Sequence, residues 1–209
     1  MPENSPVYDA IVYDAIIVAG GRASRLGGID KTSLEFEGVP LIRRALEAVE
    51  TAARTCVVGG DTLSVPARAE RVGESPLWGG PAAAVAAGIA ALRDSTSPFT
   101  AVTASDLPRV GEAMPALLAA SDELPDDIDG VLAVDGSGQR QPLLAVYRTA
   151  ALRRAVAGVP SPENLPVRRL LETLTLRELA LPDEWCADID TPEDAAGLGI
   201  VIPRPSSAG

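Results

Sequence analysis

Residues 15–31 read AIIVAGGRASRLGGIDK, in which an apolar run changes abruptly into a loop rich in glycine and cationic side chains. The apolar run is typical of a buried β-strand. Glycine lets backbone N–H groups approach phosphate oxygens, because no Cβ stands in the way. The loop also carries Arg22, Arg25 and Lys31, which concentrate positive charge in a chain whose net charge is −11. The stretch therefore predicts a strand followed by a loop that binds a polyphosphate.

The spacing in this loop differs from that of the two commonest nucleotide-binding motifs. A P-loop ends in glycine, lysine and serine or threonine, whereas Lys31 follows Ile29 and Asp30. The dinucleotide fingerprint G-x-G-x-x-G is also missing from residues 20–25. The simpler alternative is an ordinary strand-to-helix turn with surface arginines, but such turns rarely need three basic residues among several glycines.

The composition predicts a single globular domain. The chain has 209 residues, of which 46% are apolar, so it can bury a sizeable core. Its net charge of −11 argues against a nucleic-acid binder, which needs a basic surface. The chain has no histidine, which excludes the usual zinc sites and Ser-His-Asp triads. Cys56 and Cys186 do not form a metal-binding pattern and are expected to stay reduced.

The N-terminal region shows no signal-peptide pattern. Neither this region nor the rest of the chain contains an apolar run of membrane-spanning length. We therefore expect a cytoplasmic protein outside membranes. The pentapeptide VYDAI occurs at 7–11 and again at 12–16, and the second copy is expected to begin the first strand. We expect an N-terminal extension at 1–14, a single domain at 15–202 and a loose tail at 203–209.

Apolar runs and helical periodicities alternate along the chain, which predicts an α/β fold. The expected architecture is three-layered and Rossmann-like, a mostly parallel sheet with helices on both faces. Ligands of such sheets bind beyond the carboxyl ends of the strands, where both the glycine-rich loop and Asp106 fall. Further strands are expected at 55–59, 70–72, 99–104, 130–134 and 143–147. Helices are expected at 41–53, 81–92, 114–120, 150–157 and 167–174, with a last one capped by Thr191.

The run from Val18 to Lys31 resembles the A-G-G-x-x-x-R-[ML]-G-G-x-D-K signature of the molybdenum cofactor guanylyltransferases, which belong to the nucleotidyltransferase superfamily. The resemblance extends over residues 15–196 and is moderate at Asp106 and at DIDTPED, residues 188–194. It implies a Mg²⁺-dependent enzyme that moves GMP from GTP to the terminal phosphate of molybdenum-bound molybdopterin and releases pyrophosphate. The nucleophile would be an ionised phosphate oxygen, which agrees with the absence of histidine.

The resemblance also implies a set of site residues. The expected catalytic residues are Arg25, Lys31 and Asp106. Asp106 and Asp190 are the expected Mg²⁺ ligands, because this ion prefers oxygen and uses one or two protein carboxylates. The alternative for Asp106 is a surface carboxylate that caps a turn. The expected GTP-binding residues are Val18, Ala19, Gly20, Gly21, Gly27, Gly28, Lys31, Glu74, Gly80 and Asp106.

The segments expected to select the nucleotide base give conflicting indications. Glu74 resembles the family's acidic residue near guanine, whose adjacent N–H and amino donors suit an acceptor-only carboxylate. Residues 19–21, Ala-Gly-Gly, also favour guanine, since the cytidine enzymes more usually read A-A-G. The D-x-D-T-P form at 188–192 is, by contrast, frequent in related cytidylyltransferases. Three alternatives therefore stay open: a CTP-dependent molybdopterin cytidylyltransferase, a sugar-phosphate nucleotidyltransferase and a non-catalytic nucleotide-binding regulator.

The second substrate has two candidate contacts. Residues 141–143, Gln-Pro-Leu, match a family segment near that substrate. Arg168 lies in a stretch that resembles a pterin- or phosphate-binding piece, although a solvated helix face is the favoured interpretation. The expected partners are GTP, molybdopterin and molybdenum-cofactor carrier or acceptor proteins, with a monomer or weak oligomer as the expected state.

Overall fold

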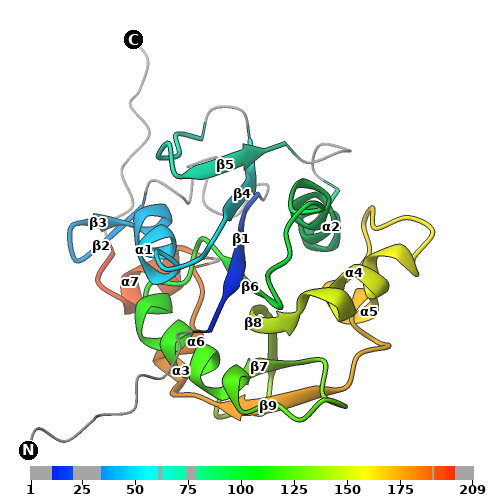
Figure 1. Ribbon diagram of the computed structural model, residues 1–209. Helices are drawn as coiled ribbons and strands as arrows, with labels where there is room; N and C mark the ends of the chain where they lie inside the picture. Colours follow the sequence, from blue (N-terminus) through cyan, green and yellow to red (C-terminus); the bar gives the residue numbers. More distant parts are fainter. Residues whose placement is uncertain (1–10, 21–33, 61–62, 74–78, 190, 201–209) are drawn as a thin grey trace, which may run out of the picture.

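The computed structural model describes residues 11–20, 34–60, 63–73, 79–189 and 191–200, and its centre is a seven-stranded sheet (Figure 1). The strand order is β5-β4-β1-β6-β8-β7-β9. Neighbouring strands run parallel except at β8, which is antiparallel to both β6 and β7. The strands are β1 (Tyr13–Ala19), β4 (Thr55–Gly59), β5 (Ala69–Val72), β6 (Phe99–Ala104), β7 (Gly130–Val134), β8 (Arg140–Arg148) and β9 (Leu176–Ala180).

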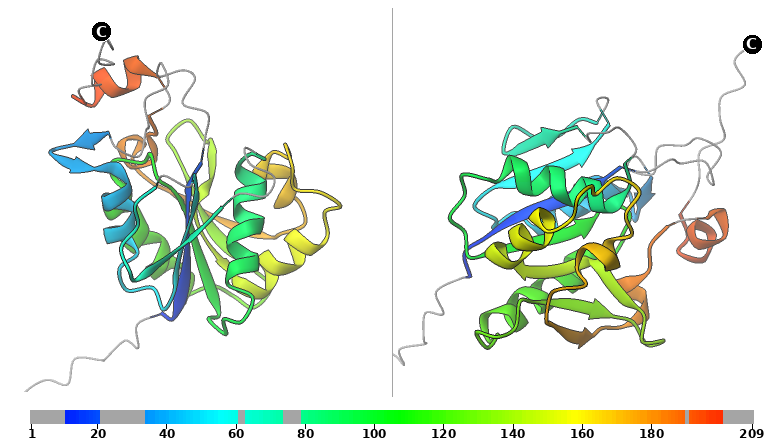
Figure 2. Two further views of the ribbon diagram at one scale, coloured as in Figure 1. Left: turned by 90° about the horizontal axis from the view of Figure 1, so that it is seen from above. Right: turned by 90° about the vertical axis from the view of Figure 1, so that its right-hand side faces the viewer.

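Helices cover both faces of this sheet, as the left view of Figure 2 shows. One face carries α1 (Leu41–Ala48), α3 (Val110–Asp122) and α6 (Asp183–Cys186). The other face carries α2 (Pro81–Ala91), α4 (Thr149–Ala157) and α5 (Val167–Leu170). A small third cluster joins α7 (Pro192–Gly197) to the hairpin of β2 (Glu35–Phe36) and β3 (Val39–Pro40). The predicted three-layer α/β fold is therefore confirmed.

Strand β1 is buried on both of its faces, which explains why its sequence is an almost continuous apolar run. Ala15 and Ile17 join the core beneath α1 and α3, whereas Ile16 and Val18 join the core beneath α2. Helix α2 lies very close to this strand, because a Cβ built on Gly88 would stand 2.7 Å from a side-chain carbon of Ile16. Glycine at this position permits the close approach of helix and sheet.

The expected elements are present, and the differences lie at their ends and near the C-terminus. Helix α1 ends at Ala48 and α5 at Leu170, both earlier than expected, and α3 begins earlier, at Val110. Strand β9 and helix α6 were not expected at all. In β9 the two leucines stand three residues apart, a spacing typical of a helix rather than a strand. The last helix begins as predicted, because the Thr191 hydroxyl accepts a hydrogen bond from the Asp194 N–H.

The second VYDAI copy contributes to the sheet. Strand β1 begins at Tyr13, and both Tyr13 and Asp14 are buried and paired with β6. The sheet thus starts before Ala15, the expected beginning of the domain, while residues 1–10 and the expected tail at 203–209 lie outside the described residues. Cys56 and Cys186 are free, as expected, and both are buried. Within the described segments, no helix is long and apolar enough to cross a membrane.

Candidate active site

The order of the strands reverses at β1, with β4 and β5 on one side of it and β6 on the other. Ligands of open α/β sheets bind beyond the carboxyl ends of the strands at such a switch point. Val18 and Ala19 end β1, and Gly20 follows them. The Ser105 N–H donates a hydrogen bond to the Val18 carbonyl at 2.9 Å. The beginning of the glycine-rich segment therefore lies directly beside the turn that carries Asp106.

Asp106 is half-buried in the turn between β6 and α3. Its backbone carbonyl accepts a hydrogen bond from the Ile189 N–H at 3.2 Å, so residues 188 and 189 lie beside this turn. Two acidic segments that are far apart in the sequence thus meet at the switch point. Asp188 is exposed, and Asp190 lies outside the described residues. Among the residues that the structure describes, no group of three or more Cys, Asp or Glu side chains is placed to hold a metal ion.

The structure places only part of the predicted site. It brings together Val18, Ala19, Gly20 and Asp106 at the switch point. The roles assigned to the other residues of the loop, to the base-reading acid and to the second metal ligand stay predictions. The site residues outside the described part of the chain are Gly21, Arg25, Gly27, Gly28, Lys31, Glu74 and Asp190.

Gly80 is the residue that precedes the first turn of α2, the helix that leads back from the carboxyl edge of the sheet. Its φ of +87° favours glycine, and Pro81 follows at the first helical position. The Gly79 carbonyl accepts a hydrogen bond from the Asn164 N–H at 2.7 Å. Asn164 itself has a positive φ of 53°. The unpaired N–H groups at such a helix start suit a phosphate or another anion.

A second polar group lies at the carboxyl end of β7 and was not predicted from the sequence. Asp135 accepts hydrogen bonds from the Ser137 hydroxyl at 2.6 Å and from the Gln139 N–H at 3.0 Å. The Ser137 hydroxyl, followed by the Gln139 N–H, holds the pKa of Asp135 below its usual value. The Gln141 side-chain NH₂ donates to the other Asp135 oxygen at 3.2 Å. This hydrogen bond fixes the orientation of the Gln141 side-chain amide, whose NH₂ group donates and whose oxygen can only accept.

The signal for this group was the turn-forming sequence Asp-Gly-Ser-Gly at 135–138, which precedes the Gln-Pro-Leu segment. Aspartate in such a turn bonds the backbone that follows it. Arg168, the other candidate contact for the second substrate, is exposed on α5.

Comparison with known proteins identifies the family. The model of the MobA-like NTP transferase domain matches residues 15–178, which include most of β1, all of β2 through β8 and most of β9. The molybdenum cofactor guanylyltransferase of Pseudomonas paraeruginosa is 30% identical to this chain over 185 residues, covering 85% of this chain and 90% of that protein. The chain belongs to the molybdenum cofactor guanylyltransferase family. It is therefore a nucleotidyltransferase.

Solved structures confirm the nucleotidyltransferase fold. The molybdopterin-guanine dinucleotide biosynthesis protein A of Archaeoglobus fulgidus superposes with a TM-score of 0.60 at 23% identity, covering 88% of this chain and 96% of that one. The 2-C-methyl-D-erythritol 4-phosphate cytidylyltransferase of Thermus thermophilus superposes with a TM-score of 0.59 at 17% identity, covering 88% and 95% of the two chains. Because the similarity extends to a protein named a cytidylyltransferase, the fold alone does not identify the nucleotide base.

Proposed function

We propose that this nucleotidyltransferase moves GMP from GTP to the terminal phosphate of molybdenum-bound molybdopterin and releases pyrophosphate. The observation that carries the proposal is the hydrogen bond from Ser105 to Val18, which joins the two chemically distinctive segments at the switch point of the sheet. Membership of the molybdenum cofactor guanylyltransferase family supports the choice of substrates. In this reaction a phosphate oxygen attacks the α-phosphorus of GTP, and the bond from that phosphorus to pyrophosphate breaks.

The residues at the switch point suit Mg²⁺. Asp106 offers a half-buried carboxylate, and the backbone hydrogen bond from Ile189 holds residues 188 and 189 beside its turn. Asp106 and Asp190 would hold the ion, which takes one or two carboxylates together with phosphate oxygens and water. When bound, Mg²⁺ would neutralise part of the charge of the triphosphate.

The remaining catalysis is positioning and charge stabilisation. Backbone N–H groups of Gly20, Gly21, Gly27 and Gly28 would hold the triphosphate. Lys31 and Arg25 would stabilise the charge that develops on pyrophosphate. No protein base is needed, because the attacking phosphate oxygen is already ionised, and this agrees with a chain that has no histidine.

Glu74 is the proposed reader of guanine, since its carboxylate would accept from two adjacent donors of that base. The DIDTP sequence at 188–192 favours the second candidate, a CTP-dependent molybdopterin cytidylyltransferase. Cofactor carrier or acceptor proteins, a cytoplasmic location and a monomer or weak oligomer complete the proposal.

Pyrophosphate release with each of the four NTPs, molybdenum-bound molybdopterin and Mg²⁺ tests the reaction and the base together. Release with GTP alone supports the proposal, release with CTP alone supports the second candidate, and binding without release indicates a regulator. Asp106→Asn is expected to abolish the Mg²⁺-dependent rate. Asp126→Asn is the matched control, because Asp126 is an exposed carboxylate in the loop that precedes β7.

Lys31 offers a direct test of the phosphate-binding loop, because it is the only lysine of the chain. An amine-directed reagent can therefore modify only Lys31 and the amino terminus, which peptide mass spectrometry resolves. GTP with Mg²⁺ is expected to protect Lys31 while the terminal amine reacts at an unchanged rate. Equal reaction of both amines with and without nucleotide would remove Lys31 from the proposed site.

A further inference from the structure

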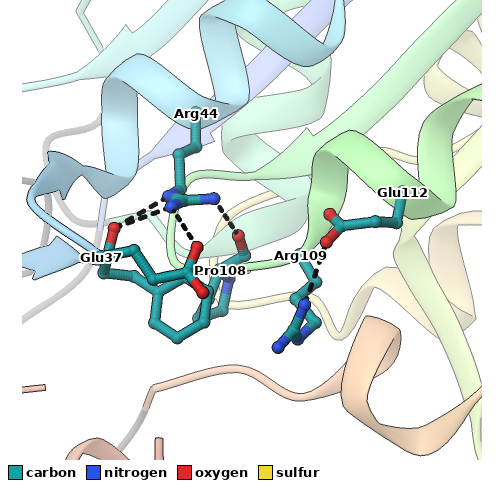
Figure 3. Close-up of polar contacts among 6 residues, drawn as sticks. Glu37, Arg44, Pro108, Arg109 and Glu112 are labelled. Atoms are coloured by element: carbon teal, nitrogen blue, oxygen red, sulfur yellow. Dashed lines mark hydrogen bonds and ion pairs between the residues drawn. The ribbon is translucent and has the colours of Figure 1, made fainter. Parts of the chain in front are cut away.

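Arg44 on α1 joins two segments that converge on the candidate active site (Figure 3). Its Nε and Nη2 donate to the Phe36 carbonyl at 3.1 and 2.8 Å. Its Nη1 donates to the Pro108 carbonyl at 3.4 Å, and Pro108 stands two residues after Asp106. Nη2 also contacts the Glu37 carboxylate at 3.0 Å. One guanidinium thus connects the β2–β3 hairpin to the turn that carries Asp106.

The ring of Phe36 strengthens the same connection. The guanidinium carbon of Arg44 lies 4.7 Å from the ring centroid, and that of Arg109 lies 5.3 Å from it. Arg109 follows Pro108 directly, so the ring is held by a cation from α1 and by a cation from the Asp106 turn. Glu112 in turn accepts a hydrogen bond from Arg109 at 3.1 Å, which fixes the orientation of the second guanidinium.

A third segment meets the other two at this point. Phe36 is buried in a cluster with Ile189, and the Ile189 N–H donates to the Asp106 carbonyl. The side chain of Arg44 is only 19% exposed, so it is part of the packed structure rather than a solvated surface charge. A planar guanidinium with five donors in a fixed fork can serve two carbonyls and a carboxylate at once, whereas an ammonium group cannot do so with the same geometry.

We propose that Arg44 is a positioning residue that fixes the Asp106 turn relative to the β2–β3 hairpin and thereby couples metal binding to nucleotide binding. This inference rests on the proposed function, in which Asp106 holds Mg²⁺ while Lys31, five residues before Phe36 in the sequence, binds the phosphates. A Mg²⁺–triphosphate complex spans both groups, so their relative position determines how strongly one ligand enhances the other. Arg44 itself contacts neither ligand in this proposal.

The test measures the affinity for GTP by calorimetry with and without Mg²⁺, in the wild type and in Arg44→Met. The factor by which Mg²⁺ raises the affinity is expected to fall at least about fivefold in Arg44→Met, the lower end of ordinary coupling between sites. The affinity without Mg²⁺ is expected to stay within about twofold of the wild type, since each loop still forms. A purely structural defect would lower both affinities together.

Arg43 supplies the matched control. It is the neighbouring arginine on α1, its side chain is 70% exposed, and its guanidinium pairs with Glu47 on the same helix. Arg43→Met is expected to keep the wild-type Mg²⁺ effect. Arg44→Lys keeps the charge but not the fork, so it is expected to behave like Arg44→Met, and it replaces that variant should Arg44→Met fail to fold.

The Asp106→Asn background separates the two proposals. In that background Arg44→Met is expected to have no additional effect on the dependence on Mg²⁺, because the carboxylate that it positions is gone. If the wild type shows no Mg²⁺-dependent GTP binding, the proposed function fails. If the wild type shows it and Arg44→Met matches Arg43→Met, the proposed function survives and the role of Arg44 is refuted.

Discussion

Substitution of Gly88 by alanine tests the packing that holds α2, and with it Gly80, against the sheet. In the interior of a helix this change is ordinarily favourable by about 1 kcal/mol. Here the new Cβ would stand 2.7, 2.9 and 2.9 Å from three side-chain carbons of Ile16, which is fully buried in the centre of β1. Overpacking of a dense core costs about 1–3 kcal/mol. All three contacts are below 3.0 Å, so we expect the upper end of that range and a net loss of about 2 kcal/mol.

The assay is thermal unfolding followed by circular dichroism. For a chain of this size, a loss of about 2 kcal/mol corresponds to a fall in Tm of about 4–8 °C. Gly111→Ala is the matched control, because Gly111 lies in α3 and a Cβ there meets no atom within 4 Å. That control is expected to raise the stability slightly or to leave it unchanged.

The second half of this prediction concerns Ile16. Ile16→Ala removes all three carbons that the new Cβ would meet, at a cost of about 2–5 kcal/mol for the cavity. In this background Gly88→Ala is expected to become stabilising, so the sign of its effect reverses. If Gly88→Ala is neutral in the wild type and unchanged in the Ile16→Ala background, helix α2 does not lie this close to β1.

Three other predictions concern single groups. Asp135→Ala is expected to lower the free energy of unfolding at neutral pH. The difference in stability between this variant and the wild type should shrink below pH 3.8 and vanish once the pH falls below the lowered pKa of Asp135. Unfolding of both proteins measured at a series of acidic pH values tests this. Burial raises the pKa of Cys56 to about 12 and that of Cys186 to about 11. Neither thiol should therefore react with a disulfide reagent at pH 8 until the protein unfolds, and the free energy of unfolding should decline above pH 9. Rapid labelling of the native protein would contradict this. Glu74→Gln should reduce the preference for GTP over CTP in pyrophosphate release, and an unaltered preference would exclude Glu74 as the reader of the base.

The sequence predicted the parts of the fold that long apolar runs specify. Strand β1 and its glycine-rich continuation, and β6 with Asp106 after it, follow from residues that are contiguous in the chain. Strand β9 escaped prediction because, among the strands of the described residues, it pairs only with β7, and its two leucines have helical spacing. The end of α5 was also missed, because Leu171 and Leu174 continue the apolar pattern although they pack beyond the helix.

Contacts between distant segments of the candidate site could not be predicted from the sequence. Arg43 and Arg44 are identical neighbours in the sequence, yet Arg44 is largely buried and donates to Pro108, 64 residues away, whereas Arg43 faces solvent. Helical periodicity gives no reason to distinguish them. Asp135 likewise accepts a hydrogen bond from the side chain of Gln141, which lies on the other side of the β7–β8 turn. Local patterns predict where a loop begins, but the contacts that fix two loops relative to each other arise only from the fold.

The distribution of cations explains how so acidic a chain can bind an anionic substrate. Several arginines connect segments of the scaffold: Arg148 donates to the carbonyls of the α3–β7 loop, and Arg153 to the carbonyls of Leu92 and Ser95. These charges are held by the protein itself and are not aimed at a ligand. The net charge of −11 gives the chain no overall attraction for GTP, and salt screens charges that lie farther from a ligand than a Debye length of about 8 Å. Attraction must therefore come from cations in direct contact with the phosphates. Under the proposed function, Arg22, Arg25 and Lys31 would supply them within ten residues of the chain, directly after the strand whose end contacts the turn that carries Asp106.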